Sequence, residues 1–82
     1  MKVLKFYADW CGPCKAQTKI IEQAGDKIKT KIEEVNIDAN IFLSTQFNIR
    51  SVPTMVLVDD DEKEIKRITG FQSEKDLLAW LE

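Results

Sequence analysis

The chain has no histidine and only two cysteines among its 82 residues. This shortage limits metal chemistry, because a structural zinc site needs four ligands and two thiols complete one only in a dimer that shares both cysteine pairs. A c-type haem attachment is disfavoured as well, since Lys15 rather than histidine follows the second cysteine. The sequence therefore predicts neither a bound metal nor another bound cofactor.

The sequence also lacks a large excess of charge of one sign, and it has no long apolar run. Lys and Arg total 12 against 14 for Asp and Glu, which gives a net charge of −2. The sequence has no basic stripe of the kind that would favour nucleic acid as a partner. It also has no apolar run long enough to suggest a membrane span. The chain begins directly with a predicted strand and shows no signal-peptide pattern, so we expect a cytoplasmic protein. In a reducing cytosol a close cysteine pair is typically catalytic or metal-binding.

The length suits one domain, residues 1–82, and the apolar pattern divides it into seven elements. Strands are predicted at residues 3–7, 31–37, 54–58 and 64–69, and helices at residues 14–24, 41–47 and 73–81. The first helix is expected to bury Ala16, Ile20, Ile21 and Ala24 and to end at Gly25. The turn at residues 38–40 is expected to cap the second helix, and Ser73 the third.

The connections between these elements predict the topology. The first two strands are joined by a helix and should be parallel, with a right-handed crossover. The last two are joined by a four-residue acidic turn and should form an antiparallel hairpin. The sequence therefore predicts an α/β protein of order βαβαββα, a mixed four-stranded sheet with helices on both faces.

Both cysteines lie in the segment Trp10-Cys11-Gly12-Pro13-Cys14, where a strand ends and a helix begins. A thiol at a helix N-terminus becomes more acidic, because the free N–H groups and the helix dipole favour negative charge there. We expect Cys11 to be the nucleophile, and Cys14 to be the resolving thiol that attacks the mixed disulfide. Gly12 lets a substrate backbone approach, and Pro13 stiffens the turn.

The chain resembles the thioredoxin family in residues 6–15, 35–40 and 49–54 and in Gly70, which occur in the family's order and spacing. The motif WCGPC between a strand and a helix is a specific signal, whereas a bare CxxC is not. The resemblance implies a thioredoxin-like fold with strand order 2-1-3-4. It also implies a short form of that fold, without the family's usual first strand and helix.

The resemblance also implies a substrate groove. The Val52–Pro53 bond would be cis and lie beside the cysteines, and the backbone of Val52 would pair with an extended substrate segment. Taken alone, Pro53 also suits the start of an edge strand. We expect Trp10 to be an exposed ring on this groove. The predicted substrate-binding residues are Trp10, Gly12, Pro13, Val52, Pro53 and Gly70.

Lys5 and Glu34 depart from the family, which carries an aspartate and a lysine at the matching positions. Both charges are reversed, so we expect Lys5 and Glu34 to replace that pair in handling protons near Cys14. The alternative is that Lys5 extends to solvent and has no role in the chemistry.

These features predict a thiol–disulfide oxidoreductase that reduces disulfide bonds in protein substrates. We expect a monomer with no cofactor besides its cysteines, whose electrons come from a thioredoxin reductase. Two alternatives stay open. One is a glutaredoxin-like protein reduced by glutathione, which the short chain favours. The other is a non-catalytic binding subunit with a thioredoxin fold.

Overall fold

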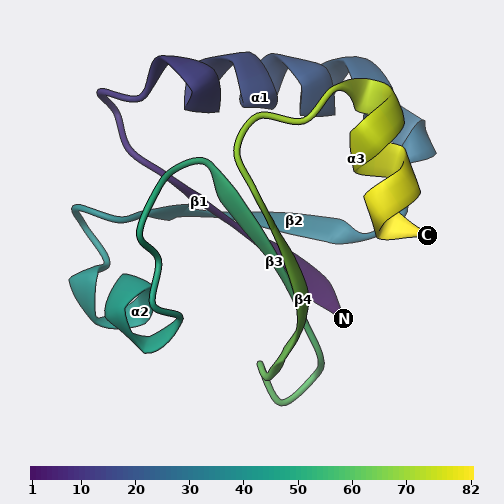
Figure 1. Ribbon diagram of the computed structural model, residues 1–82. Coiled ribbons are helices and arrows are strands. Elements are labelled where there is room, and N and C mark those ends of the chain that lie inside the picture. Colours follow the sequence, from purple (N-terminus) through teal and green to yellow (C-terminus); the bar gives the residue numbers. More distant parts are fainter.

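A mixed four-stranded sheet lies at the centre of the protein, whose computed structural model describes residues 1–82 (Figure 1). The strands lie in the order β2-β1-β3-β4; β1 and β2 are parallel, and the other two pairs are antiparallel. Their bounds are β1 Lys2–Tyr7, β2 Lys31–Asn36, β3 Thr54–Val58 and β4 Glu64–Thr69. The predicted α/β class, element order and strand order are confirmed.

Helices cover both faces of the sheet, as predicted. The helices α1 and α3 lie on one face and the short helix α2 on the other (Figure 1). The bounds are α1 Gly12–Ala24, α2 Ile41–Gln46 and α3 Glu74–Leu81, with a single 3₁₀ turn, η1 Gly25–Lys27, after α1. None of the helices has both the length and the apolar character needed to cross a membrane.

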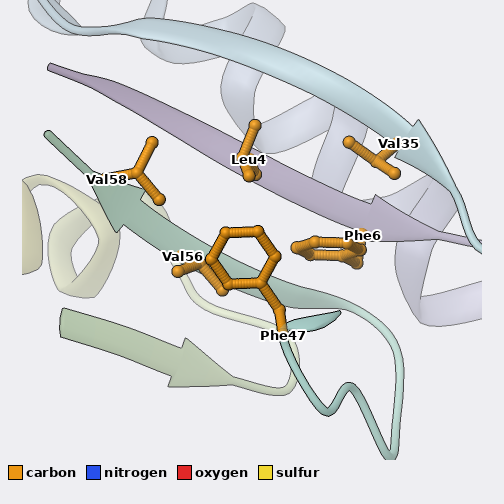
Figure 2. Packing of buried hydrophobic residues seen from close by; sticks show 6 residues of the cluster. All are labelled: Leu4, Phe6, Val35, Phe47, Val56 and Val58. Carbon is orange, nitrogen blue, oxygen red and sulfur yellow. The ribbon is translucent and has the colours of Figure 1, made fainter. Parts of the chain in front are cut away.

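The side chains of β1 alternate between two hydrophobic clusters, because successive residues of a strand point to opposite faces. Leu4 and Phe6 pack on the α2 side, and the ring of Phe6 lies 5.8 Å from that of Phe47. Figure 2 shows this cluster, with side chains of β1, β2 and β3 around Phe47. Val3 packs on the other side, with residues of α1 and α3. Lys5 therefore also points toward α1.

The buried stripe of α1 differs from the predicted one. Ala16 is exposed, and the wholly buried residues of the helix are Cys14, Gln17 and Ala24. Gln17 and Ala24 follow Cys14 by three and ten residues, a spacing that places all three on one face of the helix. Ala16 is rotated away from that face toward solvent. Because Gln17 is polar, the apolar pattern did not place it on the buried side.

The predicted helix caps are partly confirmed. The hydroxyl of Ser73 accepts a hydrogen bond from the Asp76 backbone N–H and so caps α3. Asn40 precedes α2, but its side chain makes no capping hydrogen bond. It donates instead to the backbone oxygen of Asn36, at 3.1 Å, and so closes the turn before the helix.

Arg67 of β4 joins the terminal hairpin to the segment after α2. Its guanidinium donates to the carbonyl oxygen of Phe47 at 2.7 Å and to both carboxylate oxygens of Glu64 at 2.6 and 2.8 Å. These charge-assisted hydrogen bonds lower the pKa of Glu64 below its ordinary value. Glu64 therefore stabilises the folded protein most in its ionised form.

Replacing Glu64 with glutamine tests this ion pair. A lowered folded-state pKa means that the stabilisation is complete above the ordinary value of 4.5 and is lost as the pH falls below it. We expect Glu64→Gln to lower the free energy of unfolding by about 0.3–1 kcal/mol at neutral pH. The loss should shrink as urea unfolding is repeated at more acidic pH. Glu22→Gln, at an exposed site on α1, is the control. A loss of unfolding free energy in Glu64→Gln that does not vary with pH contradicts the prediction.

Candidate active site

Three segments that are far apart in the sequence meet at the N-terminal end of α1: the end of β1, the start of β3 and the end of β4. The central residue of this arrangement is Thr54, which pairs with Phe6 on one side and with Thr69 on the other. This register brings Pro53 and Gly70 beside the end of β1, from which the chain runs into the cysteine motif. The Gly70 N–H donates to the carbonyl oxygen of Pro53 at 2.8 Å, so the two flanking segments are also joined to each other.

The two cysteines form a disulfide at the start of α1, with their Cα atoms 5.2 Å apart. Cys11 is the N-cap of the helix, and its Sγ accepts a hydrogen bond from the Cys14 N–H at 3.1 Å. Both residues are buried, Cys14 slightly more than Cys11. A helix N-terminus stabilises negative charge, so the position of Cys11 Sγ favours a thiolate once the disulfide is reduced.

The Val52–Pro53 bond is cis, as the resemblance implied. The carbonyl oxygen of Val52 lies 3.7 Å from Cys11 Sγ, so this loop borders the sulfur. Gly70 has a φ of +90°, which side-chain-bearing residues rarely adopt, and the space where its Cβ would lie is open. Backbone of the Val52–Pro53 loop thus lies close to the cysteine pair, and Gly70, which is bonded to Pro53, leaves open space beside it.

Exposed side chains surround this backbone. The indole of Trp10 is 69% exposed and donates from Nε1 to Asp38 at 3.1 Å, which holds the ring in place. Phe71 is also exposed, and so are Gly12 and Pro13. The structure therefore brings the predicted substrate-binding residues together around the cysteines: Trp10, Gly12, Pro13, Val52, Pro53 and Gly70.

Lys5 is completely buried, so the alternative in which it extends to solvent is wrong. Its register partner on β2 is Glu34, and its Nζ lies 3.3 Å from each carboxylate oxygen of that residue. Nζ also donates to the hydroxyl of Thr18 and lies 5.7 Å from the centre of the Tyr7 ring. Glu34 itself is half-exposed.

Thr18 connects this charged pair to the redox helix, and the sequence pattern did not single it out. Its hydroxyl accepts from Lys5 and donates to the Cys14 carbonyl oxygen at 3.2 Å. A pocket of about 260 Å³ opens at this point, and Cys14, Thr18 and Glu34 all line it. The only signal in the sequence was position, since a residue four after Cys14 lies one turn along on the same helix face.

Gln17 is a second residue that the pattern missed. Its side chain is fully buried, and its amide makes two hydrogen bonds to the backbone of Gln72, between β4 and α3. A polar residue within the stripe that contains Cys14 and Ala24 was the available signal.

No group of three or more histidine, cysteine, aspartate or glutamate side chains is arranged to hold a metal ion.

A disulfide between the N-cap and the first turn of a helix, next to a cis-proline loop on this fold, defines a dithiol–disulfide redox protein. Comparisons with known proteins agree. The family model Thioredoxin matches residues 1–82. The chain is 37% identical to a thioredoxin of Rickettsia felis over 81 residues, which are 96% of this chain and 76% of the relative. It is 33% identical to a thioredoxin of Staphylococcus haemolyticus, covering 100% of this chain and 80% of the relative.

Solved structures give the same result. A mutant thioredoxin from Halobacterium salinarum matches with a TM-score of 0.85 and 30% identity, over 96% of this chain and 69% of that one. Thioredoxin 1 of Thermosipho africanus matches with a TM-score of 0.79 and 29% identity, over 96% of this chain and 88% of that one. The chain belongs to the thioredoxin family, and its function is thiol–disulfide oxidoreduction. These matches do not favour the glutaredoxin-like alternative or the non-catalytic one.

Replacing Thr18 with valine tests the connection between Lys5 and the redox helix. Valine keeps the shape of threonine but removes the hydroxyl, so the buried ammonium loses one partner and the Cys14 carbonyl loses a donor. We expect the free energy of unfolding to fall by about 1–3 kcal/mol, measured by urea denaturation. Thr45→Val, at an exposed site on α2, is the matched control and should have little effect. Equal effects of the two substitutions would argue against the connection.

Proposed function

We propose that the chain reduces disulfide bonds in proteins, with Cys11 as the nucleophile and Cys14 as the resolving thiol. The observation that carries this proposal is the position of Cys11. Its sulfur caps α1, accepts the Cys14 N–H and lies beside the Val52 carbonyl oxygen. A sulfur held there is favoured as a thiolate and is bordered by backbone that an extended substrate can reach.

The reaction consists of two thiol–disulfide exchanges. The Cys11 thiolate attacks one sulfur of the substrate disulfide; a Cys11–substrate bond forms, and the other substrate sulfur leaves as a thiolate and takes up a proton. Cys14 then loses its proton and attacks Cys11 Sγ. The Cys11–Cys14 bond forms, the mixed disulfide breaks, and the second substrate sulfur leaves. The substrate gains two electrons and two protons, and the protein is oxidised.

The groove proposed for the substrate is built mainly from backbone. An extended segment would lie along Val52, as in strand addition, with Gly70 allowing close approach on one side. Trp10 offers an exposed apolar ring on the other side. Gly12 has no side chain that would obstruct a substrate next to the sulfur, and Pro13 stiffens the turn. Such a groove suits many protein sequences, because main-chain hydrogen bonds do not depend on side-chain identity.

The electron donor in this proposal is a thioredoxin reductase, which would return the Cys11–Cys14 disulfide to the dithiol. The protein would act as a monomer in the cytoplasm, with its cysteines as the only redox group. Thioredoxin relatives among bacteria support this donor. Glutathione is the competing donor, and turnover with NADPH and a thioredoxin reductase can be compared directly with turnover with NADPH, glutathione and glutathione reductase.

Insulin reduction with cysteine variants tests the assignment of roles. The wild-type chain should reduce insulin disulfides in the presence of NADPH and a thioredoxin reductase. Cys14→Ser should accumulate a covalent mixed disulfide with its substrate, visible by non-reducing electrophoresis, because the resolving step is lost. Cys11→Ser should form no such adduct at a comparable rate. No turnover by the wild type with either donor system, or trapping by Cys11→Ser alone, would contradict the assignment.

Lys5 and Glu34 are proposed to handle protons for Cys14. The resolving thiol must lose its proton before it attacks, and it borders the same pocket as Thr18 and Glu34. The Lys5 ammonium is buried against Thr18, whose hydroxyl is bonded to the Cys14 carbonyl oxygen. A positive charge near a thiol favours the thiolate, and Glu34 partly offsets that charge.

Two substitutions with opposite expected effects test this role. Lys5→Met removes the cation, so the pH profile of the resolving step should move to higher pH, by about one unit. Glu34→Gln leaves the ammonium without its counter-charge, so the profile should move to lower pH. Single-turnover kinetics across pH measure both, with Lys2→Met on the same strand as the control. Profiles that coincide with that of the wild type would rule out the proposed role.

A further inference from the structure

The side chain of Gln17 forms a two-point connection between α1 and the segment that follows β4. Its Nε2 donates to the Gln72 carbonyl oxygen at 3.1 Å, and its Oε1 accepts from the Gln72 N–H at 2.7 Å. The amide thus pairs with the backbone of Gln72 as a neighbouring strand would. Gln17 is fully buried, and a buried amide is stable only when its polar atoms are bonded.

The segment held by Gln17 is the one that borders the proposed groove. Gln72 follows Gly70 and Phe71, and the Gly70 N–H is bonded to the carbonyl oxygen of Pro53. The segment Gly70–Gln72 is therefore held at both ends. Gly70 is bonded to Pro53, and Gln72 is bonded to Gln17. Figure 1 shows this connection between β4 and α3 running next to α1.

We propose that Gln17 is a positioning residue for protein substrates: it holds Gly70 and Phe71 where an extended substrate segment binds. This inference rests on the proposed function, because it concerns the same groove. Gln17 acts through Gln72 and not through the sulfur atoms: Cys11 Sγ accepts from the Cys14 N–H, and its other polar neighbour is the Val52 carbonyl oxygen at 3.7 Å. Its loss should weaken substrate binding and leave the reactivity of the Cys11 thiolate unchanged.

Gln17→Met is the main variant, because methionine is similar in size and apolar, and cannot bond both backbone groups of Gln72. Gln23→Met, at an exposed site on the same helix, is the matched control. We expect the KM for insulin to rise about tenfold in Gln17→Met, with kcat nearly unchanged, which corresponds to about 1.4 kcal/mol of binding energy. The rate with the small disulfide dithiobis(nitrobenzoate), which needs no groove, should equal that of the wild type and of Gln23→Met.

Amide hydrogen exchange gives a readout that does not depend on activity. The N–H groups of Gly70 and Gln72 should be protected in the wild type, and both should exchange faster in Gln17→Met. If Gln17→Met does not fold, Gln17→Glu is used for the same measurements, because it keeps the size of the side chain and the bond to the Gln72 N–H. At neutral pH its carboxylate repels the Gln72 carbonyl oxygen, so the same changes are expected.

The outcomes separate this inference from the proposed function. A wild-type chain that reduces neither insulin nor the small disulfide counts against the proposed function itself. An active wild type together with an unchanged KM in the Gln17 variants overturns the role of Gln17 alone. Equal losses toward insulin and the small disulfide overturn it as well, since they would show a general structural defect.

Discussion

The buried ammonium of Lys5 is the constraint on which the redox site depends. A charge inside a protein is tolerated only when it is paired and hydrogen-bonded. Its partners come from two other elements, Glu34 on β2 and Thr18 on α1. The strand before the cysteines, the strand beside it and the helix after them are therefore fixed to one another at a single point. That point lies beneath the helix turn that carries Cys14.

The other half of the site is fixed by neutral hydrogen bonds. The contact between Gly70 and Pro53 joins the two segments that flank the sulfur, and Gln17 ties the second of them to α1. The site thus has two supports of different chemistry. The charged one lies on the β1–β2 side, next to the resolving thiol, whereas the neutral one lies on the β3–β4 side, where the proposed substrate binds. Disturbing one should affect proton handling, and disturbing the other should affect recognition.

Sequence patterns predicted most of the fold for physical reasons that are local. The apolar run of β3, the cap at Ser73 and the strand-to-helix motif at Cys11 all depend on neighbouring residues. The interior polar contacts could not be predicted in this way. Gln17 and Thr18 look like ordinary solvent-facing helix residues until the segment after β4 and the strand β1 are placed against them, because their partners lie far away in the sequence. The burial of Lys5 likewise depends on how closely α1 covers the sheet.

If the Lys5 ammonium acts on Cys14, then the rate at which Cys14 resolves the mixed disulfide must depend on that charge, because a nearby cation favours the thiolate. Single-turnover reduction of insulin at neutral pH, with the decay of the mixed disulfide followed after acid quenching, measures this directly. We predict that resolution is about tenfold slower in Lys5→Met than in the wild type, while Lys2→Met resolves at the wild-type rate. Equal rates in the wild type and Lys5→Met would show a purely structural ion pair and would contradict its role in the chemistry.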